Sequence, residues 1–285
     1  MRHASFFRIL FWTVVAALLL PSGMAGADQR GDGPLDTAKP NNLTPQQIID
    51  RFAAKEREFK LAREHYTYQQ SIIVQTLDGN TVTGEFRLVE DVLFDDKGRR
   101  IQQVRFAPQS TLENGGISMS REDMDDIEHR LPFVLTTEEI LEYDILYVGQ
   151  QRVDELRTYV FDIAPKAIEK NKRYFQGRIW VDNEDFQIVK TEGKTVPDIR
   201  KKNSENLFPK FTTWREQVDG QYWFPTYTRA DDILHFHTSL QGDVHIREII
   251  KYTDYKRFGA DVKITYQGGE LPKAEAQQPA PKPRK

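Results

Sequence analysis

The sequence contains no cysteine, so no disulfide can stabilise it and no thiol can act as a nucleophile. It also lacks the G-x-S-x-G, P-loop and G-x-G-x-x-G patterns that indicate a serine hydrolase or a nucleotide-binding site. A chain without disulfides must be held together by its own hydrophobic core.

Long apolar runs are also missing, except at the N-terminus. There, Ile9 to Leu20 follows the basic residues Arg2 and Arg8 and precedes the small-residue site Ala25-Gly26-Ala27. This is the pattern of a secretory signal peptide. The run of about 12 residues is shorter than the roughly 20 that span a bilayer. We therefore predict cleavage after residue 27 and a soluble, exported protein, with no cysteine at the cleavage site to carry a lipid.

The mature chain has no excess of positive charge. Without Arg2 and Arg8, 38 basic residues stand against 43 acidic ones, a net charge of −5. A nucleic-acid-binding domain is usually basic, so this balance argues against nucleic acid as a partner.

Three segments follow the signal peptide. Residues 28–43 are rich in Gly, Pro and Asp and are interpreted as a flexible linker. Residues 44–267 carry the periodic patterns of a folded domain, and residues 268–285 form a Pro- and Lys-rich tail that we expect to be disordered.

The domain begins with clear helix signals. Thr44 is placed as an N-cap, Pro45 as the first helical residue, and Gln47 completes a capping box. We predict a helix from there to about Glu64, with an apolar stripe on one face.

Strand patterns dominate the rest, interrupted by a helical insertion at 107–142 with helices expected at 121–131 and 137–142. About eleven strands are expected. They span residues 65–75, 81–94, 99–106, 143–150, 156–164, 173–181, 186–193, 210–218, 221–229, 233–240 and 244–258. This order predicts a mainly β (α+β) protein with a single strongly curved antiparallel sheet, whose open side the few helices plug.

The stretch 177–194 reads as a hairpin with its turn at residues 182–185 and Val181 opposite Phe186. Ile179, Val181, Phe186 and Ile188 then share one apolar face, while Trp180 lies on the other. A slightly longer turn is the alternative. We expect the apolar face on the covered side of the sheet and Trp180 on the outer or rim side.

Three histidines are the weak candidates for a metal site. Pairing Leu240 with Val244 places His235, His237 and His245 on one face of a hairpin, where they could hold zinc. The same register sets Arg247 opposite His237, which would oppose a cation. We therefore favour a polar outer face and predict no metal.

Four motifs resemble the periplasmic lipoprotein-carrier superfamily, the LolA/LolB-like proteins. They are LTPQQIIDRFAAKEREFKLAREHYTYQQSI, YVGQQRVDELRTYVFDIAPK, RIWVDNEDFQIVKTE and TWREQVDGQYWFPTYTR. They occur in the family's order behind a signal peptide, and the resemblance extends over most of residues 43–266.

The resemblance implies a half-open β-barrel in the periplasm, with lid helices over an apolar cavity that takes acyl chains. Implied partners are lipid or lipoprotein acyl chains and membrane-associated donor and acceptor proteins. It implies no catalysis and no cofactor. The alternative is a periplasmic sensor or regulatory domain that binds a protein partner in envelope-stress signalling. The residues expected to line the cavity are Phe86, Leu88, Phe161, Ile179, Val181, Phe186 and Ile188.

A carrier of this family holds its lid with one arginine. In this chain Arg87, Arg99, Arg100 and Arg105 are all candidates, and the sequence does not choose between them.

Overall fold

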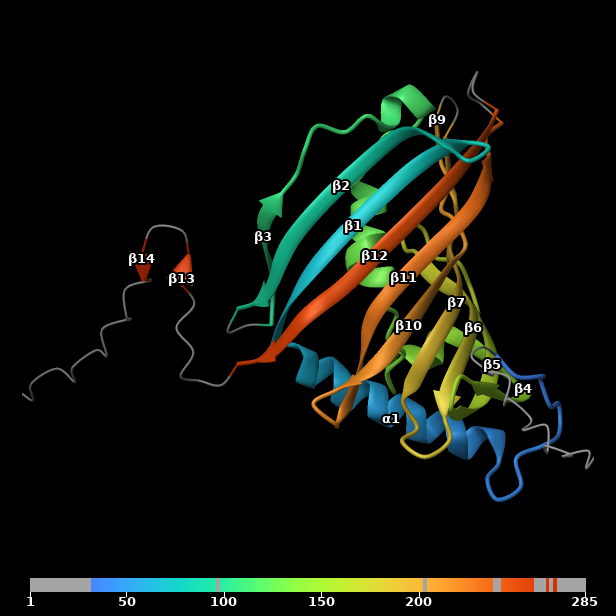
Figure 1. Ribbon diagram of the computed structural model, residues 1–285. Helices are drawn as coiled ribbons and strands as arrows, with labels where there is room; N and C mark the ends of the chain where they lie inside the picture. The colour runs from blue at the N-terminus through green and yellow to red at the C-terminus, as the bar shows by residue number, and fades with distance from the viewer. Residues whose placement is uncertain are drawn as a thin grey trace, which may run out of the picture.

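The computed structural model describes residues 32–95, 98–201, 204–237 and 242–258, together with two short strands near the C-terminus. Ten of its strands form one antiparallel sheet. From edge to edge they are β3 (Arg100–Phe106), β2 (Thr81–Phe94), β1 (Tyr66–Asp78), β12 (Asp243–Arg257), β11 (Tyr222–His235), β10 (Phe211–Val218), β7 (Ile188–Val196), β6 (Tyr174–Asp182), β5 (Leu156–Pro165) and β4 (Tyr143–Val153). The sheet is strongly curved and its edge strands β3 and β4 do not pair with each other (Figure 1). The predicted mainly β class and open, curved sheet are confirmed.

The predicted signal peptide lies outside the described residues, as do residues 271–285 of the predicted tail. Two small pairs stand apart from the main sheet, β8 (Ile199–Lys201) with β9 (Ser204–Asn206), and β13 (Thr265–Tyr266) with β14 (Gly269–Glu270).

One strand prediction was wrong. The segments 221–229 and 233–240 were expected to be separate strands, but β11 is continuous as far as His235. The polar pair Asp231-Asp232 resembled a turn in the sequence. In the structure the ladder runs through it, with Asp231 opposite Arg247 and Asp232 opposite Ile246. A charged partner on the neighbouring strand, Arg247 opposite Asp231, makes a dipeptide of this kind compatible with a sheet.

The first helix, α1 (Pro45–Arg63), has the predicted cap. Thr44 Oγ1 accepts a hydrogen bond of 3.2 Å from the Gln47 amide, and Gln47 Oε1 accepts one of 2.8 Å from the Thr44 amide. The helix lies across one end of the strands (Figure 1). Its apolar stripe joins the main core, where the Phe52 ring lies 5.6 Å from that of Phe161.

The insertion contains four short helices, η1 (Leu112–Gly115), α2 (Arg121–Asp125), η2 (Asp126–Arg130) and η3 (Glu139–Glu142). The predicted helix at 121–131 is α-helical only at its start. It continues as a π-helical turn, in which the Leu131 amide donates to the Asp126 carbonyl at 3.0 Å. Ile127, Leu131 and Leu135 of the insertion are buried in the main core together with residues of α1. The helices therefore cover the concave face of the sheet.

Part of the expected linker lies along the edge strand β4. The Asp36 and Gln150 backbones exchange two hydrogen bonds of 2.8 and 2.7 Å, and the Gly33 amide donates to the Arg152 carbonyl at 2.7 Å. The approach is close at Gly149, where an added Cβ would lie 2.2 Å from the Asp36 carbonyl oxygen. Glycine at this position allows the segment to pair with β4.

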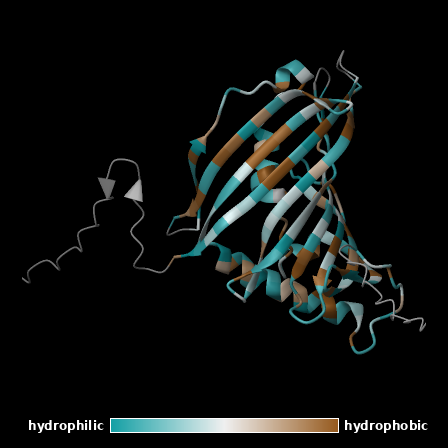
Figure 2. Cartoon of the chain, viewed as in Figure 1, coloured by the Kyte–Doolittle hydropathy of each residue, from teal (hydrophilic) through white to brown (hydrophobic). Residues whose placement is uncertain are grey.

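Apolar and polar residues alternate along the strands (Figure 2), which separates two faces. The concave face carries the main core. The convex face carries a small cluster of Val153, Val160, Trp180 and Val189. No described helix is long and apolar enough to cross a membrane.

The 177–194 hairpin has the predicted faces but a different register. Val181 pairs with Ile188 rather than Phe186, and an irregularity follows Trp180. The turn is longer because Asp182 Oδ1 accepts hydrogen bonds from the amides of Glu184 and Asp185, at 2.8 and 2.7 Å. Trp180 lies on the convex face, where its Nε1 donates to Gln151 Oε1 at 2.7 Å.

Candidate functional site

The seven residues expected to line a cavity all belong to the concave side. Leu88, Phe161, Ile179, Val181 and Ile188 are buried in the main core, and Phe86 and Phe186 pack against it. None of the seven lines either of the two cavities described below. They pack tightly instead, as Phe161 does against Phe52 of α1, and their contact with an acyl chain stays a prediction.

The cavity that adjoins the main core, called the main cavity, has a volume of about 310 Å³ and lies between the sheet and the insertion. Apolar side chains form most of its wall. From the strands these are Val74, Phe211, Leu234 and Ile246, from the insertion Ile117, Met119, Ile127 and Leu131, and from the segment between β9 and β10 Leu207, Phe208 and Pro209. A concave, mostly apolar cavity with few polar groups is typical of a small-molecule site.

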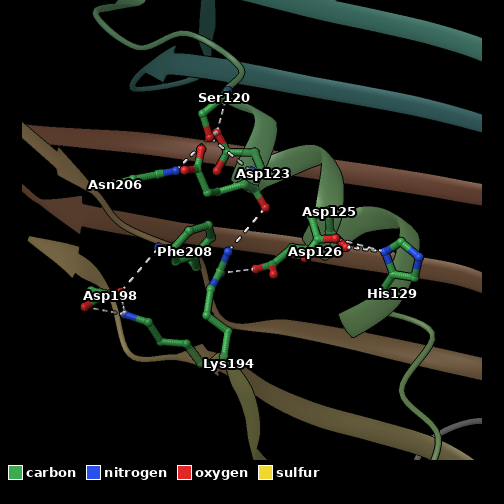
Figure 3. Close-up of polar contacts among 11 residues, drawn as sticks. Ser120, Asp123, Asp125, Asp126, His129, Lys194, Asp198, Asn206 and Phe208 are labelled. Carbon is green, nitrogen blue, oxygen red and sulfur yellow. Dashed lines mark hydrogen bonds and ion pairs between the residues drawn. The ribbon is translucent and has the colours of Figure 1, made fainter. Parts of the chain in front are cut away.

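Polar contacts tie the start of α2 to β9 beside the cavity. Ser120 and Asp123 form a capping box, with the Asp123 amide donating to Ser120 Oγ at 3.1 Å. Asn206 Nδ2 donates to the same Ser120 oxygen at 2.7 Å (Figure 3). These bonds connect the insertion to β9 along the cavity wall.

Arg100 and Arg173 hold the insertion from two sides. Arg173, the residue before β6, forms a largely buried ion pair with Asp126 of η2. Arg100 of β3 bonds Glu90 at 2.8 Å and Glu128 of η2 at 3.3 Å. Arginines from outside the insertion therefore anchor the π-helical turn at its first residue, Asp126, and at its middle residue, Glu128.

Arg215 of β10 forms the third anchor, in the interior. Its guanidinium lies 2.8 Å from Glu56 Oε1 of α1 and also donates to the Phe133 carbonyl of the insertion. Burial raises the pKa of Glu56, against the opposing effect of the Arg215 charge. One side chain therefore links α1, the insertion and the sheet.

Of the four arginines considered from the sequence, Arg100 alone contacts a helix of the insertion in the described ion pairs. Arg87, Arg99 and Arg105 pair with Glu85, Asp95 and Asp91, respectively. Arg173 and Arg215 were missed. Arg215 shares the inward face of β10 with Phe211 and Thr213, and a charged residue at an inward position was the available signal.

Glu248 is the unusual acid of the main cavity. It lies on β12 directly between Val74 of β1 and Ala230 of β11, and it is only 6% exposed. Within the described chain it has no hydrogen-bond or ion-pair partner. Burial first, and then the charges of Asp123 and Asp126, raise the pKa of Glu248 to about 8.

A second cavity of about 330 Å³ lies on the other side of η2. Arg63, Arg100, Phe59, Tyr68 and Tyr255 are among its lining residues. The π-helical turn therefore separates a cavity with several carboxyl groups from one with arginines and aromatic rings.

The register predicted for the histidine hairpin was wrong. Leu234, not Leu240, pairs with Val244, and Leu240 lies outside the described residues. Arg247 accordingly lies opposite Asp231 instead of His237. The prediction failed because it placed the turn by matching apolar residues, and β11 ends earlier than that match assumed.

The observed register gives each histidine a separate acidic neighbour. His235 Nδ1 lies 2.9 Å from Asp243 Oδ1, and His245 Nε2 lies 2.6 Å from Asp231 Oδ1. The His245 contact is the main reason why the pKa of Asp231 is lowered to about 2. The amide of His237 donates to Glu205. The described residues contain no group of three His, Cys, Asp or Glu placed to bind a metal.

No family model and no curated protein match this chain. Solved structures similar to it include a DUF1329 family protein from Desulfovibrio piger, with 14% identity and a TM-score of 0.39 over 77% of this chain and 94% of that one. A LolA superfamily protein from Nitrosomonas europaea matches with 14% identity and a TM-score of 0.29 over 76% and 94%. An outer membrane lipoprotein-sorting protein domain from Vibrio parahaemolyticus matches with 12% identity and a TM-score of 0.33 over 75% and 94%.

At these identities and TM-scores the similarity assigns no ligand and no residue role. The assignment of the fold is based on the strand order and the registers of this chain itself. One of these structures carries the name of the superfamily that the sequence motifs resemble.

Proposed function

We propose that this protein, exported to the periplasm after loss of residues 1–27, binds the acyl chain of a lipid or lipoprotein in the main cavity and carries it between membranes. The observation that supports this most is the cavity of about 310 Å³ with mainly apolar walls. Each buried CH₂ group contributes roughly 0.8 kcal/mol, so an alkyl chain can be held with few polar contacts.

The insertion supplies the lid in this proposal. It covers the concave face, where its apolar residues pack in the main core, and polar contacts from Arg100, Arg173 and Arg215 hold it without a continuous strand pairing. Contacts of this kind can be broken and remade without unfolding the sheet, which a carrier requires for loading and release.

The direct test is to purify the mature protein, extract it with organic solvent and analyse the extract by mass spectrometry. We expect a co-purifying lipid and saturable binding of a fluorescent fatty acid. Finding no lipid, together with no binding of the fluorescent probe, would refute the proposal.

A cavity-filling variant locates the binding. Met119 lines the cavity and is partly buried, so Met119→Trp should block it and reduce binding of the probe at least tenfold. Leu61 is exposed on α1, and Leu61→Trp is the matched control that should bind normally. Equal binding by both variants would place the acyl chain elsewhere.

A release experiment tests the lid. Arg173→Gln removes the charge that holds Asp126, so the probe should load and dissociate several-fold faster in stopped-flow measurements. Unchanged rates would show that the insertion does not gate the cavity.

A further inference from the structure

The main cavity contains a carboxyl group that has no hydrogen-bond or ion-pair partner among the described residues. Glu248 lines this cavity at 6% exposure, and its cross-strand neighbours Val74 and Ala230 offer no polar group. A buried carboxyl group normally has hydrogen-bond or ionic partners, because removing it from water without them is costly. Glu248 has none in the described part of the chain.

The charged groups around Glu248 are mainly acidic. Asp123 and Asp126 belong to the insertion, and Glu205 of β9 also lines the cavity. The nearby cations are already paired, Arg173 with Asp126 and Arg200 with Glu205. The cavity therefore combines apolar walls with more carboxyl groups than cations.

One further acid faces the same region from β11. Asp232 is diagonal to Glu248 across the β11–β12 pair, and it accepts a hydrogen bond of 2.9 Å from the Lys210 amide. It supplies no cation for Glu248.

We propose that the cavity is selective for an amphiphile with a primary ammonium group, whose cation pairs with Glu248 while its alkyl chain fills the apolar part. The inference rests on the proposed function and narrows its ligand. An ammonium group supplies the partner that Glu248 lacks, and pairs of this kind gain strength in a water-poor site. A fatty-acid carboxylate at the same place would face the negative charges of Asp123 and Asp126 and would gain no ion pair with Glu248.

Pairing with a cation requires Glu248 to lose its proton. Because burial and the neighbouring acids raise its pKa to about 8, Glu248 is mostly protonated at neutral pH in the empty cavity. Binding of the ammonium group ionises it and releases about 0.9 proton at pH 7. The ligand stays charged, so the proton passes to the buffer.

The test compares three ligands of equal chain length, dodecylamine, dodecanol and dodecanoate, below the concentrations at which they aggregate. Affinities are measured by isothermal titration calorimetry at pH 7 in two buffers of different ionisation enthalpy. We expect the amine to bind at least tenfold more tightly than the alcohol and the carboxylate, with release of about 0.9 proton.

Two variants test whether Glu248 causes the preference for the amine. Glu248→Gln keeps the shape of the side chain, so it should bind dodecanol within twofold of wild type, lose at least tenfold in amine affinity and release no proton. Glu216→Gln, at an exposed position on β10, should behave as wild type. Retained dodecanol binding shows that the Glu248→Gln variant is folded.

The outcomes separate the two proposals. Comparable binding of all three ligands, or an amine preference that remains in Glu248→Gln, would overturn the inference about Glu248. Either result would still be consistent with the proposal that the cavity binds acyl chains. No binding of any of the three would refute acyl-chain binding itself.

Discussion

The buried acid Glu248 should make the stability of this protein fall as the pH rises. Its pKa is raised from the usual 4.5 to about 8, mainly because burial disfavours the charged form. A group of this kind binds its proton more tightly in the folded than in the unfolded chain. Its contribution to stability is therefore fully present below pH 4.5 and is lost as the pH rises through 8.

The size of the effect follows from the same values. One unit of pKa corresponds to about 1.4 kcal/mol, so full ionisation of Glu248 costs the folded state about 5 kcal/mol. Between pH 5 and pH 8, most of this loss, about 3 to 4 kcal/mol, should appear. Domains of ordinary size have total stabilities of about 5–15 kcal/mol, so this is a large share.

The assay is urea unfolding of wild type and Glu248→Gln at pH 5, 6, 7 and 8. Glutamine cannot ionise, so the stability of the variant relative to wild type should increase by about 3 to 4 kcal/mol from pH 5 to pH 8. Taking the difference cancels the other titrating groups, including Glu56 and Asp231, which both proteins share. Glu216→Gln, at an exposed site, should give a flat difference. A flat difference for Glu248→Gln as well would refute the argument that this carboxyl group is buried without a partner.

Three further predictions concern contacts that hold the helices and the edge strand. Arg215→Met leaves Glu56 buried without its cation and should cost about 3–5 kcal/mol in urea unfolding, while adding Glu56→Leu should recover most of it; additive losses would show that the pair is not coupled. Thr44→Ala removes the side-chain cap of α1 and should lower the free energy of unfolding by about 1 kcal/mol, whereas Thr44→Ser should keep most of the stability of wild type. Equal unfolding midpoints for the two variants would contradict the capping role. Gly149→Ala places a Cβ 2.2 Å from the Asp36 carbonyl oxygen, so residues 32–38 should leave β4 and be cut faster by protease; an unchanged rate of cleavage would contradict this contact.

Local signals in the sequence predicted the elements well. The cap of α1 depends on Thr44 and Gln47, three residues apart, and it formed as expected. Strand β2 matched its predicted range, and β3 differed by one residue. These features depend on neighbours within a few residues, where alternation and capping patterns are most informative.

Strand registers were less predictable, since they depend on how a turn closes. In the 177–194 hairpin, Asp182 organises a longer turn and moves the partner of Val181 from Phe186 to Ile188. The apolar face was nevertheless identified correctly, because the shift of two residues preserves the alternation of a strand. The partner of Val244 likewise moved by an even number of residues, from Leu240 to Leu234, so that pairing was wrong although the apolar face was kept.

The sequence by itself determined which side of the 177–194 hairpin faces inward, and therefore that Ile179, Val181 and Ile188 would be buried together. It could not determine which part of the concave face is filled by α1 and which part is left as a cavity. That division depends on contacts between residues far apart in the chain, such as Arg173 with Asp126 and Arg215 with Glu56. The same is true of Glu248, which in the sequence is simply one polar residue within a strand. Its isolation arises when folding places Val74 on one side of it, Ala230 on the other and the acidic insertion above.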